Sequence, residues 1–374
     1  MTNSEIMKPN TLEEINQLPT ILTILDMIAG EEEGFRQIEE KHQYFISYAG
    51  SEDKFELLSE TPDEPCVLRP FSYCFNSYFR GQYEYFDDCV PTIYRIKVEN
   101  SQNKKKDSID QFIHRLRSSE FELLLRTHPF VKSVFNEGIN LKDIGEIKLK
   151  VNYLGLAQHY ELETDMLDFT NDKWVAAFFA TNRKVGDRYS PIDSGSYGVV
   201  YRYCPPPEYF LRMNDDSKPD EKFSIIGLQP FKRPGEQKGF ALKMENGENL
   251  NQIRGIQKFF FRHDKLAAEI IHNRMNQGNN LFPFDEIEAL AQKIKGSKKI
   301  SINAFKLAFE KYPVPQMDEI KLQEACIDKG IKFVNYPIVR FSKDAEKNFI
   351  KHWKNCGEKE FFSKIVLRRT LSVG

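Results

Sequence analysis

Apolar positions recur at helical spacing in the first half of the chain. Between residues 11 and 41 they return every three or four positions, and "IDQFIHRLRSSEFELLLRT" at 109–127 repeats this pattern. Residues 151–184 read as helix, turn and helix. The second of these helices, "KWVAAFFAT" at 173–181, is apolar on nearly every side, so we expect it to be buried.

The second half adds strands to these helices. Aromatic and β-branched runs bounded by Gly or Pro predict strands at 195–203, 223–231, 236–244 and 256–262, and a further strand and turn precede them at 44–54. Helices follow from residue 265, one of them with Asp285 as its N-cap and Glu288 completing a capping box. The pattern predicts an α+β fold: a small antiparallel or split β-sheet core, a central helical insertion and flanking helices.

Composition limits the function classes. The 53 basic and 55 acidic residues nearly cancel, which disfavours a protein that acts mainly on nucleic acid. The six cysteines form no C-x-x-C pair, and neither they nor the histidines have metal-ligand spacing, so we expect reduced thiols and no metal. No signal peptide is visible, and no apolar run approaches the ~18–20 residues of a membrane span. We expect a soluble cytoplasmic protein without membrane contact.

The segment "SYFRGQYEYFDDCVPTIYR" at 77–95 contains the first candidate chemistry. Arg80 offers a planar fork of donors that suits a diphosphate or a carboxylate, and Gly81 lets a ligand approach the backbone. Gln82 continues the same site. The alternative is a structural arginine that pairs with a buried acid such as Asp168, or with backbone carbonyls.

A second polar group follows in "LAQHYELETDMLDFT" at 156–170. Gln158, His159 and Tyr160 bring together an amide, an imidazole and a phenol, which suit a nicotinamide or a purine. Asp168 and Thr170 complete the group, although both are also good caps for the helix that begins near residue 172. A structural histidine is an equal alternative for His159.

The sequence leaves open which residue would act on the sugar of such a ligand. Glu236 carries a carboxylate that could stabilise an oxocarbenium-like transition state, yet its turn between Gly and Pro suits a solvated acid. Gln257, on the last predicted strand, would bring an amide without charge, or would bond to the backbone. Otherwise the acid is Asp168.

Three segments together resemble the FRG domain over about residues 70–265. "YFRGQYEYFDDCVPTIYR" is similar to its first block, "LAQHYELETDMLDFT" followed by "AAFFA" to its second, and "NQIRGIQKFFF" to its third. The sequence departs from the family at four positions: Asp165 for Arg, Glu161 for Gly, Phe169 for Trp and Phe259 for Gly. The resemblance implies an extension at 1–69, an FRG domain at 70–295 and an α-rich extension at 296–374 that packs on the core.

A looser similarity links the chain to ADP-ribosyltransferases of the Arg-Ser-Glu type, which begin with an aromatic-Arg-Gly strand. It implies an NAD site in a transferase or NAD glycohydrolase, with Arg80 on the diphosphate and Gln257 or Glu236 facing the ribose. The acceptor, protein or nucleic acid, and the oligomeric state stay open. The family type suggests a bacterial toxin, stress or antiviral-defence effector. The alternatives are a non-catalytic module that recognises a nucleotide or a peptide and, third, a nucleic-acid-processing enzyme.

Overall fold

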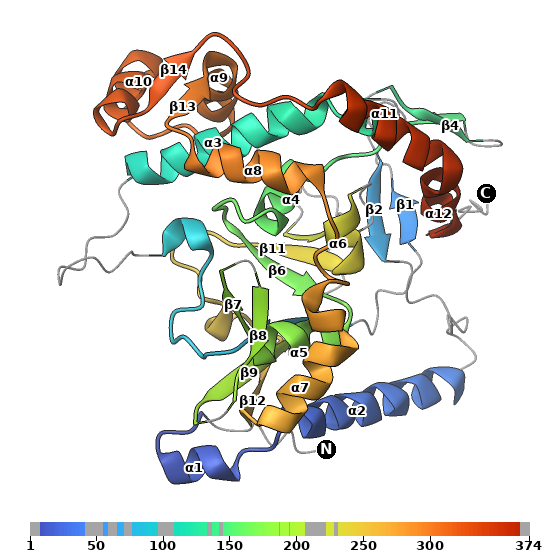
Figure 1. Cartoon of the computed structure of the whole chain (residues 1–374). Coiled ribbons are helices and arrows are strands. Elements are labelled where there is room, and N and C mark those ends of the chain that lie inside the picture. The colour runs from blue at the N-terminus through green and yellow to red at the C-terminus, as the bar shows by residue number, and fades with distance from the viewer. Residues whose placement is uncertain are drawn as a thin grey trace, which may run out of the picture.

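Six antiparallel strands form the central sheet, in the order β10-β11-β6-β3-β9-β12 (Figure 1). The computed structural model describes residues 8–41, 55–58, 66–70, 77–95, 108–132, 137–141, 145–186, 188–193, 195–205, 222–227 and 231–366. The six strands are β3 (Tyr78–Gln82), β6 (Met166–Thr170), β9 (Tyr197–Tyr203), β10 (Phe223–Ile225), β11 (Gly239–Lys243) and β12 (Ile256–Arg262).

The two middle strands of the sheet separate along their length. β3 pairs with β9 at every position from Tyr78 to Gln82, but it pairs with β6 at Phe79 and Thr170 alone. Beyond this pair β3 and β6 diverge, and the Nη1 of Arg80 donates to the backbone oxygen of Asp168 at 2.8 Å. A side chain therefore satisfies a carbonyl that a regular ladder would have paired with backbone.

One face of the sheet is covered by α2 (Ile21–Lys41), α5 (Lys173–Thr181) and α7 (Lys265–Arg274). Phe79, Val200 and Phe261 project from the strands into this layer and are almost completely buried. As the sequence predicted, α5 is largely buried, and it lies so close to β3 that a Cβ at Gly81 would be 1.8 Å from the backbone oxygen of Ala176.

The other face carries an aromatic core and a second helical layer. Strand residues such as Tyr78, Tyr201 and Phe240 pack there with α4 (Tyr153–His159), and α3 (Ser108–Arg126) and α8 (Glu286–Gly296) complete the layer. Figure 1 shows α3 and α8 in the upper part of the molecule, with α2 and α7 in its lower part beside β9 and β12.

Smaller elements surround this core. On α3 pack α9 (Ile302–Lys311) and α10 (Glu319–Asp328), beside the parallel pair β13 (Lys299–Ser301) and β14 (Lys332–Val334). Chain segments from both ends meet in a sheet of β1 (Phe55–Leu58), β2 (Val67–Pro70) and β15 (Ile365–Val366). The remaining α-helices and strands among the described residues are α1 (Leu12–Gln17), α6 (Lys232–Glu236), α11 (Lys343–His352), α12 (Glu358–Ser363), the hairpin β4 (Ile139–Leu141) and β5 (Gly145–Ile147), and the hairpin β7 (Asn182–Val185) and β8 (Arg188–Pro191).

The α+β prediction is confirmed, with three local corrections. The predicted turn within 151–184 is strand β6, which pairs with β11 over its whole length. Asp285 is the N-cap of α8 as predicted, because its side chain accepts a hydrogen bond from the backbone N of Ile287. The Glu288 carboxylate binds Arg233 instead of completing a capping box. The strand expected at 236–244 begins only at Gly239, because the preceding residues form α6 and a turn. The strand expected at 44–54 lies outside the described residues.

The described part of the chain contains no helix long and apolar enough to cross a membrane. In the same part, Cys66, Cys89, Cys204 and Cys326 form no disulfide, and all but Cys204 are buried.

We expect Gly81→Ala to destabilise the fold, because the new methyl group would overlap the backbone of α5. Overpacking of this kind costs about 1–3 kcal/mol or more. Gly30→Ala is the matched control: it lies in α2 with nothing within 4 Å of its added Cβ, and we expect a gain of roughly 0.5–1 kcal/mol from helix propensity. Urea unfolding of both variants measures the difference; equal stabilities would contradict the close packing.

Candidate functional site

A cavity of ≈ 750 Å³ opens where β3 and β6 diverge. Its walls come from β3, the segment after it up to Arg95, the end of α4, β6, α5 and the β7–β8 hairpin, with single residues from α6 and α8. This volume lies in the ~300–1,000 Å³ range of small-molecule sites.

Two arginines line the same part of this pocket. Besides the bond from Arg80 Nη1 to the Asp168 carbonyl, the Nε of Arg80 is buried without a hydrogen-bond partner among the described residues. Arg95 ends the 3-10 turn at Thr92–Tyr94, and its Nε donates to the Val90 oxygen at 3.0 Å. Partial burial and then the charge of Arg80 lower the pKa of Arg95. Two guanidinium groups that repel each other in a pocket favour an anion between them.

Asp168 lies in the same pocket with its carboxylate held from two sides. Its side chain is 36% exposed. The Nε2 of Gln158 donates to Asp168 Oδ2 at 3.2 Å, and Thr164 orients that amide by donating to its Oε1 at 2.7 Å. The Nε2 of His159 lies 3.4 Å from Asp168 Oδ1. The end of α4 therefore fixes the direction of the acid on β6.

The hydrogen bond between His159 and Gln237 shows which ring nitrogen of His159 carries a proton. Gln237 donates its Nε2–H to the Leu281 oxygen at 3.1 Å, so its Oε1 is the atom that faces His159 Nδ1 at 3.2 Å. An amide oxygen only accepts, so Nδ1 carries a proton and donates. The opposite nitrogen, Nε2, faces Asp168 Oδ1 without forming a hydrogen bond to it. The ring fits closely, since a Cβ at Gly239 would be 2.5 Å from its Cε1.

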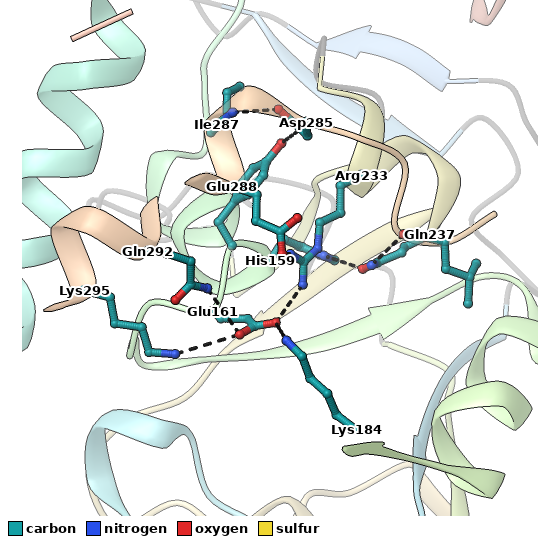
Figure 2. A network of polar contacts seen from close by, with 12 residues as sticks. His159, Glu161, Lys184, Arg233, Gln237, Asp285, Ile287, Glu288, Gln292 and Lys295 are labelled. Carbon is teal, nitrogen blue, oxygen red and sulfur yellow. Dashed lines mark hydrogen bonds and ion pairs between the residues drawn. The ribbon is translucent and has the colours of Figure 1, made fainter. Parts of the chain in front are cut away.

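Glu161 is the centre of a polar network on another part of the wall (Figure 2). The Nζ of Lys184 and the Nη2 of Arg233 lie 2.8 and 3.2 Å from its Oε1, and the Nζ of Lys295 lies 3.9 Å from its Oε2. Partial burial acts to raise the pKa of Glu161, but Lys184 and Arg233 lower it to about 2. Arg233 also binds Glu288 at 3.0 Å.

Aromatic side chains from separate elements adjoin this network. The rings of Tyr189 and Phe282 stack with centroids 4.8 Å apart, and Phe179 meets both edge-on. The guanidinium of Arg233 lies 4.8 Å from the Phe282 centroid. All these rings line the pocket. Sequence reasoning did not find them, because nothing in their local sequence shows that they meet.

Four further predicted residues lie beside Arg80, His159 and Asp168 on the pocket wall: Gly81, Gln82, Gln158 and Thr170. Some of these residues also make contacts that stabilise the local structure. Gly81 makes room for α5, whereas the sequence suggested room for a ligand. Gln82 accepts from the Cys89 thiol at 3.6 Å, and Thr170 accepts from the backbone N of Asp172, whose side chain is the actual N-cap of α5.

Three predicted residues lie elsewhere. Tyr160 is fully buried and its hydroxyl donates to Asp285, so its ring faces the core beside Phe121. Gln257 accepts from Arg202 Nε at 2.7 Å on β9, and Glu236 is exposed at the end of α6.

Asp165, the departure from the expected arginine, also points away from the pocket. It is buried against α3, where Arg115 Nη2 lies 2.8 Å from its Oδ2. The charge of this residue is therefore balanced outside the ligand space.

In a comparison with known families, the FRG domain model matches residues 76–188, so this part of the chain carries an FRG domain. The match contains the first two blocks and the Arg80–Asp168 contact, and it ends before Asn251 and Gln257 of the third. No curated protein and no solved structure matches the chain. Within the described ranges, no group of three or more His, Cys, Asp or Glu side chains could hold a metal ion.

We expect Glu161→Gln to change how stability depends on pH. The folded pKa of Glu161, about 2, lies below its ordinary 4.5, so its contribution is complete above pH 4.5 and disappears as pH falls toward 2. The shift sets an upper limit of about 3 kcal/mol, and solvent screening of a partly exposed side chain reduces this to about 1–2 kcal/mol. Urea unfolding from pH 6 to pH 3 should show wild type and variant converging. A constant difference would contradict the charge network.

Proposed function

We propose that the pocket binds NAD or a related nucleotide, with the diphosphate between Arg80 and Arg95. The observation that carries this proposal is the position of two guanidinium groups and one oriented carboxylate, Asp168, in the gap between β3 and β6. Arginine forks bind phosphate oxygens in pairs, and a diphosphate would relieve the repulsion between the two cations.

The aromatic wall supports a nucleotide rather than a simple anion. Phe179, Tyr189 and Phe282 offer ring surfaces on which a nicotinamide or adenine could pack, while the arginines hold the phosphates. A cavity of ≈ 750 Å³ leaves space for both parts of such a ligand.

Asp168 is the acid we propose for cleavage of the N-glycosidic bond. Nicotinamide leaves C1′ of the ribose with the bonding electron pair, and the carboxylate stabilises the positive charge that develops on the sugar. An acceptor oxygen or nitrogen, from water or a macromolecule, then bonds to C1′ and loses a proton. His159 and Gln158 are positioning residues, because they hold Asp168 and act through it.

This proposal extends the looser similarity to ADP-ribosyltransferases, with one change. The late-strand residue of that pattern was expected at Gln257 or Glu236, but neither lies on the pocket wall. Asp168 on β6 takes that role here. An enzyme that consumes NAD would suit a toxin, a stress effector or an antiviral-defence effector.

A non-catalytic recognition module is the second candidate. It is favoured by the bonds that the groups already make: Arg80 to a carbonyl, and Asp168 to Gln158 with His159 beside it. Such a site would bind a nucleotide without changing it.

Calorimetric titration of NAD and ADP-ribose tests the binding site. We expect Arg95→Gln to weaken both ligands by at least 10-fold, because it removes one charged phosphate donor at little cost to the fold. Arg80→Gln should weaken them further and also lower stability, since Arg80 bridges β3 and β6. Arg254→Gln, an exposed arginine outside the pocket, is the control and should bind like wild type. Unchanged affinity in Arg95→Gln would remove the diphosphate from this position.

Nicotinamide release separates the enzyme from the recognition module. We expect Asp168→Asn to lower kcat by at least ~100-fold while the Kd for NAD changes little, because the lost charge acts mainly in the transition state. The same titrations supply the Kd, and His159→Gln should fall between wild type and Asp168→Asn. Binding of NAD by the wild type without any nicotinamide release would establish the recognition module instead.

A further inference from the structure

Three cations converge on the single carboxylate of Glu161. Lys184 approaches from β7, Arg233 from α6 and Lys295 from α8, and Gln292 Nε2 adds a contact of 3.4 Å (Figure 2). Glu161 and the three cations all line the pocket. An anion therefore already occupies a place where a ligand could lie.

The backbone of Glu161 has a conformation that a glutamate rarely adopts, so the position of its carboxylate is maintained against the residue's own conformational preference. Its φ is +64°, the left-handed region that glycine adopts without strain and other residues rarely adopt. The side chain has its counter-charges from three different elements, none adjacent in sequence. The strained residue presents its carboxylate to these cations, which is the pattern of a functional position.

The surroundings would be electropositive without this carboxylate. Arg233 is anchored, with a side chain that is 4% exposed and an Nε that has no hydrogen-bond partner among the described residues. Glu288 balances one charge of the group, so loss of Glu161 would leave Lys184 and Lys295 without their shared anion. Two lysines and a buried arginine around one point are suited to a phosphate group.

We propose that Glu161 occupies a phosphomonoester subsite formed by Lys184, Arg233 and Lys295, and thereby selects NAD over NADP. The subsite stands on these contacts alone, and its use for nucleotide selection rests on the proposed function. Glu161 lines the same pocket as Arg80 and Arg95, so a further phosphate on the ribose of a nucleotide held there would come near its carboxylate. The phosphate and the Glu161 carboxylate would repel each other because both are negative, and the cations that the phosphate needs already bind Glu161.

Binding of inorganic phosphate to Glu161→Gly tests the subsite directly. We expect the variant to bind phosphate at least 10-fold more tightly than the wild type, because three cations lose their internal anion. Lys184→Ala in the Glu161→Gly background should abolish the gain. Glu161→Gln keeps the size of the side chain and should show a smaller gain, which preserves the test if the glycine variant fails to fold. Glu310→Gln removes an exposed carboxylate on α9 as the control and should bind phosphate like the wild type.

Titration of NAD and NADP separates this inference from the proposed function. The wild type should prefer NAD by at least 10-fold, and Glu161→Gly should reverse or erase that preference. A gain in phosphate binding without nucleotide binding by any variant would support the subsite and overturn the proposed function. NAD binding by the wild type, with no gain in phosphate affinity and an unchanged NADP-to-NAD ratio in Glu161→Gly, would overturn the subsite.

Discussion

The close approach of α5 to β3 at Gly81 is the constraint on which the pocket depends. A Cβ on this residue would lie 1.8 Å from the backbone oxygen of Ala176 and 2.8 Å from the backbone nitrogen of Ala180. Because only two residues separate the end of β6 from the start of α5, the contact of α5 with β3 also fixes where β6 can lie. The two strands share one pair, and Arg80 satisfies the carbonyl of Asp168 in the gap that follows. The packing of α5 thus opens the sheet between β3 and β6, while the Asp168 carbonyl keeps a hydrogen bond, from Arg80.

Local sequence predicted the elements whose stability is mostly local or whose pattern is strong. The run at 256–262 is strand β12 within the predicted bounds, and the apolar 173–181 segment is the buried α5. Strand β6 was missed because "MLDFT" is short and contains an acid. Its extended form comes from pairing with β11, more than sixty residues later, and a local window contains none of that information.

The site was predictable where its residues belong to one motif. Gln158, His159 and Asp168 lie in one segment, and the structure brings them to Arg80. The same motif misled at Tyr160, because successive residues at the end of a helix point in different directions. His159 turns to the pocket and Tyr160 to the core. The proximity of Arg95 to Arg80, and the wall built from α5, β8 and the segment before α8, depend on tertiary structure alone.

Polar atoms without partners explain why this pocket is more than a gap in packing. Among the described residues, Arg80 Nε, His159 Nε2, Asp168 Oδ1 and Arg233 Nε are buried without a hydrogen bond, and all four residues line the pocket. Each such atom typically costs about 1–3 kcal/mol, so stability alone would favour apolar replacements. Their backbone and side-chain contacts nevertheless hold these groups in fixed directions. We infer that a wall that keeps both signs of charge oriented and incompletely bonded suits a ligand that carries both an anionic group and a group that becomes cationic. The nucleotide that we propose, with a diphosphate and a reactive ribose, would meet that description, whereas a purely apolar ligand would leave every one of these atoms unsatisfied.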